Sequence, residues 1–434
     1  MQRYSKTFFL GDSEPIKEKL LHWAEQFREV VFLDNNTHQA KYSSHEAILA
    51  FDAFTLIQTD TFNAFETLKQ YQLQSKDWLF GYLSYDLKND VERLDSQNID
   101  ELKFHDLFFF QPKKIIFIEK AGLRFEYLGV CADEIDSDFE EILATQYVVE
   151  QSTQTYKVEG RVSFDAYQQG FNKVMQHIQR GDIYEANYCM EFFVKNIQLN
   201  TVRTYFNLNE ISEPPFACFV KFNKHYILCA SPERYLKKEG CKIVSQPIKG
   251  TAKRGATVSE DADLKANLLQ NEKEKSENVM IVDLVRNDLS KTAVKGSVMV
   301  EELFGIYTFK QVHQMISTVV SEVSPNENVV DIIKSTFPMG SMTGAPKLSA
   351  MKIIEEVEQS KRGVYSGAVG YFTPTNDFDF NVVIRSIFYN KDLDYASFSV
   401  GSAITINANA TDEYNECLLK ANAMKKVLEN GTTV

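Results

Sequence analysis

The sequence predicts an α+β fold with large, mainly antiparallel β-sheets that are covered by helices. Several β-rich runs follow one another with only short turns between them, which favours antiparallel pairing over a regular βαβ alternation. Longer helical patterns with dense Gly and Pro punctuation appear between these runs from about residue 161 onward. The predicted strands are 217–221, 225–230, 242–244, 368–372, 379–388 and 396–405.

The chain divides into two regions. Residues 1–150 are rich in Phe and contain short β-like runs and acidic loops, so we expect an N-terminal β-rich region that packs on the rest. Residues 160–434 carry the motifs described below. The polar stretch 150–155 is the predicted linker between the two regions.

Composition excludes several classes of function. With 44% hydrophobic and 25% charged residues, the chain of 434 residues has the composition of a soluble globular protein. A net charge of −13 argues against binding to nucleic acid, which requires a basic surface. The sequence has neither a signal peptide nor an apolar run of about 20 residues, so we expect no membrane contact. The scattered cysteines indicate reduced thiols, and we predict a cytoplasmic enzyme.

The first candidate for a reacting group is Lys249, which lies in a turn with the sequence P-I-K-G-T. Pro247 restricts the backbone before the lysine, and Gly250 allows another group to approach closely. A second turn upstream, S-P-E-R, supplies the carboxylate of Glu233. Burial lowers the pKa of an amine, and a partly neutral lysine is a nucleophile. The alternative is a solvated lysine in an ordinary hairpin turn.

Two predicted helices, 263–289 and 411–428, each carry two glutamates three residues apart on one face. If the two pairs converge, they form an all-oxygen site suited to Mg²⁺, which prefers carboxylates, waters and substrate oxygens. The alternative is that each pair belongs to an ordinary solvated helix face. The carboxylates are those of Glu274, Glu277, Glu413 and Glu416.

A glycine-rich segment, 337–347, differs from a phosphate-binding loop of the Walker type because Ala-Pro separates its last Gly from Lys347. Pro346 instead predicts the start of a helix. The N–H groups of that helix start, with the hydroxyls of Ser341 and Thr343, form a candidate site for a polar or anionic group. The alternative is a tight strand-to-helix turn without a ligand.

Hydrogen-bonding side chains also occur within β-rich sequence near the C-terminus. Arg385 alternates with apolar neighbours, which places it either in a polar cavity or on the solvent face of a one-sided sheet. A bidentate arginine, a tyrosine hydroxyl and the backbone N–H groups of small residues together form a receptor for a carboxylate. The other members of this predicted receptor are Tyr365, Gly401, Ser402 and Ala403.

Taken together, the motifs resemble those of the chorismate-utilising enzymes and occur in the same order. The resemblance is dense from about residue 160 to 430, and it also includes G-Y-L-S-Y-D near the N-terminus. The motifs are G-Y-L-S-Y-D (81–86), G-D-I-Y-E-A-N (181–187), S-P-E-R (231–234), P-I-K-G-T (247–251), E-N-V-M-I-V-D-L-V-R-N-D-L (277–289), G-S-M-T-G-A-P-K (340–347), R-G-V-Y-S-G-A-V-G-Y-F (362–372) and E-Y-N-E-C-L-L-K-A (413–421).

The resemblance implies that residues 160–434 form a catalytic region that binds chorismate. It implies a Mg²⁺ ion on Glu277 and Glu416, with Glu274 and Glu413 beside them, which binds the carboxylate of the ring. The pyruvyl carboxylate would be held by the predicted receptor. The remaining residues expected to line the substrate pocket are Ser341, Thr343, Gly250 and Thr251.

The lysine at position 249 distinguishes subgroups of this family. Members that form anthranilate have a small residue there, whereas the lysine form resembles the subgroup that makes 4-amino-4-deoxychorismate for p-aminobenzoate and folate synthesis. For that subgroup the resemblance implies a covalent adduct at Lys249, with Glu233 as general acid and base. The alternatives are an enzyme that forms anthranilate, isochorismate or salicylate, and a non-catalytic member that retains the fold.

The chain departs from the family pattern at several positions. Gln314 stands where the family often has a histidine, with His313 directly before it, and Glu185 replaces a commoner glutamine. The segment 32–35 matches the tryptophan-binding segment of some relatives too weakly to predict that ligand. The chain shows no glutaminase signature, so the resemblance implies that a separate glutaminase subunit supplies the ammonia.

Overall fold

The computed structural model describes residues 2–10, 16–38, 41–42, 45–120, 122–147 and 155–429. Its helices are α1 (Ile16–Ala24), α2 (Ala64–Ser75), α3 (Lys88–Val91), α4 (Ile135–Ala144), α5 (Phe164–Arg180), α6 (Thr201–Ser212), α7 (Val258–Gln270), α8 (Glu272–Ser290), α9 (Val329–Thr336), α10 (Lys347–Val357) and α11 (Ala410–Glu429), with 3₁₀ turns at Tyr85–Leu87, Ala132–Glu134 and Gly340–Met342. Its strands are β1 (Arg3–Phe9), β2 (Glu29–Asp34), β3 (Ala47–Thr59), β4 (Leu79–Leu83), β5 (Leu107–Glu119), β6 (Gly122–Leu128), β7 (Glu159–Gly160), β8 (Glu185–Lys195), β9 (Phe216–Phe222), β10 (His225–Ser231), β11 (Arg234–Glu239), β12 (Lys242–Gln246), β13 (Ile248–Lys253), β14 (Met299–Thr308), β15 (Val312–Glu322), β16 (Gly344–Ala345), β17 (Ala368–Phe372), β18 (Phe378–Asn381), β19 (Ser386–Asn390) and β20 (Tyr395–Ile404).

The long strands β3 and β5 belong to two antiparallel sheets. One half of this pair, 47–51 with 114–118, continues through β2, β9, β10, β19, β20 and β8 to form the first sheet. The other half, 53–59 with 107–112, continues through β4, β17, β18, β11, β12 and β15 to form the second sheet. The N-terminal region therefore supplies strands to both sheets.

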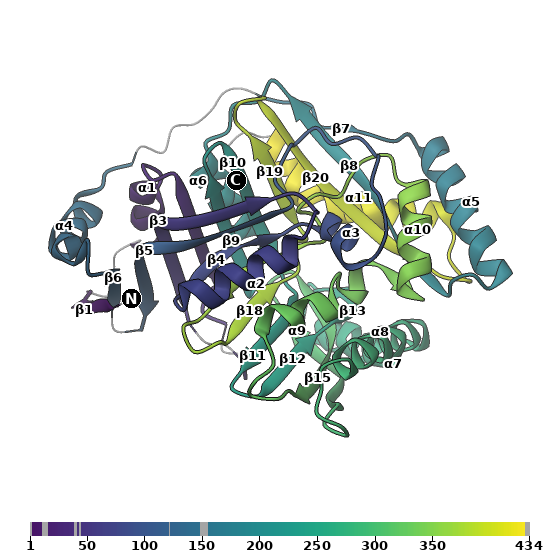
Figure 1. The fold of residues 1–434 in the computed structure, drawn as a ribbon. Helices are drawn as coiled ribbons and strands as arrows, with labels where there is room; N and C mark the ends of the chain where they lie inside the picture. The colour runs from purple at the N-terminus through teal and green to yellow at the C-terminus, as the bar shows by residue number, and fades with distance from the viewer. Residues whose placement is uncertain are drawn as a thin grey trace.

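Two apolar cores lie on opposite faces of the first sheet. Successive residues of a strand point to opposite faces, so Val30 and Phe32 of β2 pack in one core and Val31 packs in the other. The first core lies under α1, α5, α6, α10 and α11, and the second fills the space between the sheets and reaches under α2, α8 and α9. Figure 1 shows α5, α10 and α11 beside β8 and β20, with α7, α8 and α9 gathered near β11, β12 and β15.

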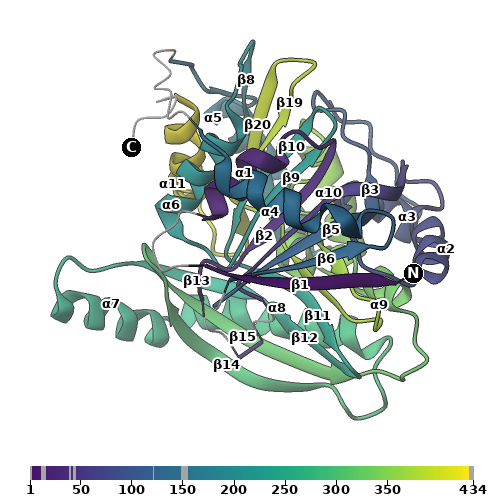
Figure 2. The ribbon, with the colours of Figure 1, turned by 90° about the vertical axis from the view of Figure 1, so that its left-hand side faces the viewer.

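The predicted α+β class with antiparallel sheets is confirmed. The predicted strands 217–221, 225–230 and 368–372 correspond to β9, β10 and β17, and the predicted start of a helix at Pro346 corresponds to the N-cap of α10. Figure 2 shows β14 and β15 as long curved strands, with α7 at one end of them. The division of the chain near residues 150–160 stays a prediction, because positions 150–154 of the predicted linker lie outside the described residues.

The predicted helix 263–289 is wrong as one element, because it consists of two helices, α7 and α8. Asn271 separates them and acts as the N-cap of α8, where its side chain accepts hydrogen bonds from the N–H groups of Lys273 and Glu274. An N-cap forms hydrogen bonds with N–H groups that have no partner within the helix. Asn271 therefore marks the start of a second helix. This break sets the direction in which α8 presents its glutamates.

The predicted strand 379–388 is also interrupted, between β18 and β19. Here Val382 donates a hydrogen bond to the carbonyl of Glu233 at 3.0 Å, and Val383 donates to Gly367 at 2.9 Å. Arg385 then adopts a left-handed backbone with φ +54°, which turns the chain before β19 begins. The interruption therefore attaches the segment of Arg385 to two of the motif turns.

No helix among the described residues is long and apolar enough to cross a membrane.

Candidate active site

The candidate active site lies where the ends of the two sheets meet. Lys249, on β13, points its Nζ to 2.8 Å from Oε1 of Glu185, the first residue of β8. The two side chains are 13% and 1% exposed, so this is a buried ion pair between the sheets. The other oxygen, Oε2 of Glu185, is buried and has no hydrogen-bond partner among the described residues. The sequence marks Glu185 only as a departure from the family pattern and gives no sign of this contact.

The position of Glu185 depends on a close approach by the glycine-rich segment. β8 begins by pairing with the short strand β16, in which Ala345 lies opposite Glu185. Gly344 has a φ of +154°, and a Cβ atom there would lie 2.1 Å from the carbonyl oxygen of Glu185. Such a contact is sterically impossible without movement of the backbone, so Gly344 is required for the two segments to touch.

Replacing Gly344 with Ala should lower the free energy of unfolding by about 1–3 kcal/mol, because the added methyl group must displace β8. Chemical denaturation followed by circular dichroism measures this change. The matched control is Gly160→Ala on β7, where the nearest atom to an added Cβ lies at 3.5 Å. Equal stability of the two variants would contradict this account of Gly344.

Glu233 is buried close to the lysine turn. Its exposed fraction is 4%, and its carboxyl group accepts hydrogen bonds from the Ser341 hydroxyl and the backbone N–H of Ile248. Burial raises the pKa of Glu233 to about 7, although Ser341 and Lys249 act in the opposite direction. At neutral pH this carboxyl group is therefore protonated in a large fraction of molecules, as a general acid must be.

The expectation that the site lowers the pKa of Lys249 is wrong. Burial alone acts in that direction, but the carboxylates of Glu185, Glu277 and Glu233 more than offset it, and the pKa of Lys249 is raised above its ordinary value. The carboxylates that surround the lysine stabilise its charged form. A nucleophilic role for Lys249 therefore requires a group that takes its proton.

The two pairs of glutamates face each other across α8 and α11. Nζ of Lys273 lies 3.9 Å from Oε1 of Glu277 and 3.9 Å from Oε1 of Glu413, so this lysine bridges the two helices. Nζ of Lys420 lies 2.6 Å from Oε1 of Glu416. Glutamates of the two helices therefore lie near one another, with an ammonium group between two of them, and the Mg²⁺ site stays a prediction.

The charges of these carboxylates are poorly compensated. Burial raises the pKa of Glu277 to about 7, and burial together with the neighbouring Glu416 raises the pKa values of Glu274 and Glu413. The Glu416 side chain is 47% exposed, and the ammonium group of Lys420 lowers its pKa. Among the described residues, no three His, Cys, Asp or Glu side chains already stand together as a metal cluster. Mutually repelling carboxylates on facing helices nevertheless fit a hard divalent cation.

Arg385 and Tyr365 lie near each other, as predicted for a carboxylate receptor. Within the described part of the chain, the Arg385 guanidinium makes no hydrogen bond or ion pair; Tyr365 and Glu416 are the groups that stabilise its charge. Burial lowers the pKa of Arg385, which shows that its charge is poorly solvated. The Tyr365 hydroxyl is buried, 3.9 Å from Sγ of Cys189. A partly buried guanidinium without a partner fits an anionic ligand.

Gly401, Ser402 and Ala403 lie on β20 and pair with β8. Because β19 pairs with β20 only as far as Ser397, no described strand covers the other edge at these residues. Alternate N–H groups of an antiparallel strand point to each edge, so part of this backbone is available to a ligand. The hydroxyl of Ser402 instead lies 3.4 Å from the hydroxyl of Tyr167 on α5.

The remaining predicted pocket residues differ in their placement. The Ser341 side chain contacts Glu233, as described above. Thr343 is fully buried, and its hydroxyl donates to the carbonyl oxygens of Met339 and Gly340 within its own turn. Gly250 has a φ of +98° and packs against Glu274, while Thr251 is exposed on β13.

His313 and Gln314 differ in their surroundings. Nε2 of His313 lies 3.0 Å from Oδ1 of Asp261 on α7, and Nδ1 lies 3.0 Å from the Thr308 hydroxyl, so the imidazole is held within the scaffold. Oε1 of Gln314 is buried without a hydrogen-bond partner among the described residues.

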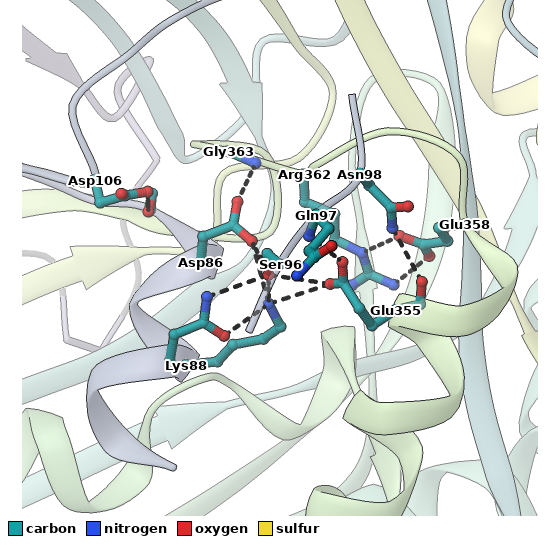
Figure 3. A network of polar contacts seen from close by, with 12 residues as sticks. Asp86, Lys88, Ser96, Gln97, Asn98, Asp106, Glu355, Glu358, Arg362 and Gly363 are labelled. Atoms are coloured by element: carbon teal, nitrogen blue, oxygen red, sulfur yellow. Dashed lines mark hydrogen bonds and ion pairs between the residues drawn. The ribbon is translucent and has the colours of Figure 1, made fainter. Parts of the chain in front are cut away.

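A buried arginine that the sequence analysis did not single out connects several site segments. Arg362 donates to the carbonyl oxygen of Met342 at 2.6 Å and to that of Asn187 at 2.7 Å, and it pairs with Glu358 at 2.7 Å. The following Gly363 donates its N–H to Asp86 of the N-terminal region at 2.9 Å (Figure 3). Arg362 thus links β8, the glycine-rich turn and the segment of Tyr365. Arg362 is the first residue of the motif R-G-V-Y-S-G-A-V-G-Y-F, and this position in the sequence could have identified it as a candidate.

Two cavities adjoin these elements. The first, of about 20 Å³, is lined by Glu233, Ser341 and Pro247 among others. The second, of about 80 Å³, lies between the N-terminal region and the second sheet and includes Leu33 and Asn381 in its lining. The first cavity belongs to the candidate active site, and the second lies beside the segment 32–35.

The fold and the site together define a class of enzyme with a carboxylate-rich centre for a small anionic substrate. The model of the family of chorismate binding enzymes matches residues 21–426. The chain therefore belongs to the chorismate binding enzyme family, and it is an enzyme that acts on chorismate.

Individual relatives carry different names. The chain is 33% identical over 362 residues to aminodeoxychorismate synthase component 1 of Bacillus subtilis, covering 80% of this chain and 76% of the relative. It is 30% identical over 370 residues to anthranilate synthase component 1 of Cereibacter sphaeroides, covering 81% and 73%. The solved structure of anthranilate synthase component I from Streptococcus pneumoniae shares the fold, with a TM-score of 0.79, 23% identity and coverage of 97% and 99%.

Proposed function

We propose that this enzyme converts chorismate and ammonia into 4-amino-4-deoxychorismate. The observation that supports this choice is Lys249, a buried amine in contact with Glu185 and within the electrostatic influence of Glu233. Anthranilate-forming members resemble this chain but have a small residue at that position. The name of the Bacillus subtilis relative, aminodeoxychorismate synthase component 1, agrees with the proposal.

The proposed reaction has two substitutions. Nζ of Lys249 attacks C2 of chorismate, both conjugated ring double bonds shift, and the C4 hydroxyl leaves as water with a proton from Glu233. Ammonia then attacks C4, both double bonds shift back, and the lysine amine is expelled from C2. The nitrogen of ammonia ends at C4 because each substitution connects C2 and C4 through the two conjugated double bonds.

Other residues bind and orient the substrate. The guanidinium of Arg385, the hydroxyl of Tyr365 and the free edge of Gly401–Ala403 are proposed to bind the pyruvyl carboxylate. Ser341 keeps the Glu233 carboxyl group in place through its hydrogen bond. Thr343, Gly250 and Thr251 are proposed to shape the pocket from the two turns.

Glu277 and Glu416 are proposed to hold Mg²⁺, with Glu274 and Glu413 as neighbouring ligands. When bound, Mg²⁺ supplies positive charge that neutralises the ring carboxylate of chorismate and the repelling glutamates. The chain supplies these carboxylates from α8 and α11. We also propose that ammonia comes from a separate glutaminase subunit, since the relative that supports this function is itself a first component.

The product distinguishes this function from its alternatives. The purified chain is incubated with chorismate, ammonium and Mg²⁺, and an aminodeoxychorismate lyase is added. We expect p-aminobenzoate. Formation of anthranilate, isochorismate or salicylate would reject the proposal in favour of the corresponding subgroup, and unchanged chorismate would indicate a non-catalytic member.

Glu233 should impose an alkaline limit on the reaction. Its raised pKa of about 7 means that the acid form is present below neutral pH and is lost as the pH rises through 7. We therefore expect the rate of loss of the C4 hydroxyl to fall about tenfold per pH unit above the apparent pKa. Single-turnover measurements between pH 6 and 9 test this.

The variant Glu233→Gln should be slower than wild type by roughly 10²–10⁴-fold, and it should lose this alkaline limit. A rate that does not change between pH 6 and 9 in the wild type would show that Glu233 is not the proton donor.

A further inference from the structure

Lys249 has one contact through which a proton can leave it. Among the described residues, Glu185 is the one carboxylate within 4.0 Å of its Nζ. Glu277 and Glu233 act on Lys249 from further away. Glu185 is 1% exposed, and the 2.8 Å contact is a hydrogen bond along which a proton can pass directly.

The Glu185 carboxylate is also incompletely solvated. Its Oε1 is bonded to Lys249, while its Oε2 is buried without a hydrogen-bond partner in the described part of the chain. An ionised carboxylate with a buried, unpaired oxygen is costly, and a neutral amine beside a neutral acid avoids that cost. A substrate that displaces solvent from the side of Lys249 increases this cost, and so favours transfer of the proton to Glu185.

Building on the proposed function, we propose that Glu185 is a second catalytic residue, the base that takes the proton from Lys249 before the lysine attacks chorismate. The ion pair becomes a neutral amine and a neutral carboxylic acid. The amine forms the C2–N bond while the C4–O bond breaks and Glu233 gives its proton to the departing hydroxyl. The adduct nitrogen carries the positive charge.

The second half of the reaction returns Glu185 to its ionised form and Glu233 to its acid form. Ammonia forms the C4–N bond, and the lysine leaves C2 as a neutral amine that takes its proton back from Glu185. The new C4 ammonium group gives one proton to Glu233. The sum is chorismate and ammonia consumed and 4-amino-4-deoxychorismate and water formed, with both glutamates and the lysine in their starting states.

Several charged groups surround this pair. Glu185 approaches Lys249 from β8, Glu233 lies after β10, Glu274 and Glu277 face Lys249 from α8, and Glu416 faces it from α11. The other four are carboxylates that remain in a Glu185 variant. A change in the pH dependence of adduct formation in the Glu185 variant therefore results from the loss of this one carboxylate.

The test follows the formation of the Lys249 adduct. The full chain with Mg²⁺ is mixed with chorismate in the absence of any amine, and intact-mass spectrometry measures the adduct between pH 6 and 10. We compare wild type with Glu185→Gln, which keeps a hydrogen-bond acceptor but cannot take a proton. The matched control is Glu191→Gln on the same strand, where Glu191 is buried in an ion pair with Arg161 at 2.9 Å.

We expect the Glu185→Gln variant to form the adduct at least tenfold more slowly than wild type at pH 7. Its rate should rise about tenfold per pH unit below pH 7, where Glu233 stays protonated, and level off above pH 7, where ionisation of Glu233 offsets the gain in neutral lysine. Wild type and Glu191→Gln should show no rise below pH 7 and should fall above it. A variant rate equal to or faster than wild type at pH 7 overturns the proposal, because Glu185 would then only hold the lysine in its charged form.

A second variant covers the case in which Glu185→Gln does not fold. Glu185→Asp keeps the acid, so a slower reaction with the pH profile of wild type supports the proposal, and a tenfold rise per pH unit below pH 7 overturns it. The product assay on wild type separates this inference from the proposed function. If wild type forms no 4-amino-4-deoxychorismate, the proposed function fails, whatever the Glu185 variants do.

Discussion

Replacing Lys249 with Ala should lower the formation of 4-amino-4-deoxychorismate by roughly a thousandfold or more, because the covalent route is lost with the nucleophile. The fold should be retained, since alanine removes one charge of a buried pair at the edge of the cavity and leaves the sheets intact. The space left at C2 should allow ammonia or water to attack there directly, which shifts any remaining product towards substitution at C2. Chromatography of the products with mass detection measures both effects.

The control for Lys249→Ala is Lys253→Ala, an exposed position on the same strand, which should retain the activity of wild type. Wild type incubated with chorismate alone should carry a mass adduct that tandem spectrometry assigns to Lys249. If the Lys249→Ala variant made 4-amino-4-deoxychorismate at the rate of wild type, the lysine would only position the substrate.

Removal of divalent cations should abolish turnover, and added Mg²⁺ should restore it. Without a cation, Lys273 is the group that lies between Glu277 and Glu413, and it supplies less charge than Mg²⁺. We expect Glu277→Gln and Glu416→Gln each to lower turnover by roughly a hundredfold or more, because each removes a negative ligand. Turnover after treatment with EDTA, followed by titration of Mg²⁺, measures the requirement.

The matched control is Glu272→Gln on the same helix, where the side chain is 84% exposed and contacts only Lys275 among the described residues. This variant should keep the turnover and the Mg²⁺ affinity of wild type. Full turnover of wild type in metal-free buffer would reject the two-helix cation site. A direct binding measurement by calorimetry would show the loss of affinity in Glu277→Gln independently of activity.

The sequence predicted the local parts of this site well. Apolar residues one turn apart placed Glu277 on the inner face of its helix, where its side chain is 13% exposed. The same pattern placed Glu413 on the buried face of α11, whereas the Glu416 side chain is 47% exposed. Runs of strands separated by short turns predicted antiparallel sheets. These features depend on residues a few positions apart, which a single sequence displays directly.

The parts that failed depend on contacts between distant segments. The turn at Arg385 requires a left-handed backbone that is fixed by hydrogen bonds from Val382 and Val383 to remote turns. The contact between Glu185 and Lys249 joins strands of different sheets, so the residues next to either of them in the chain do not predict it. The raised pKa of Lys249 follows from that same contact. The break at Asn271 did have a local signal, since Asn before a charged helical turn is a common N-cap.

The pairing of β4 with β17 has a consequence for how the protein is made. β4 is synthesised early, yet one of its edges is completed only by β17, in the last quarter of the chain. One edge of β2 is likewise completed only after β9 has been synthesised. Exposed strand edges are templates for pairing with other chains, and long-range pairing slows folding. While the ribosome is still adding the middle of the chain, the N-terminal strands therefore have unpaired edges, and this nascent stage is where chaperone binding should matter most.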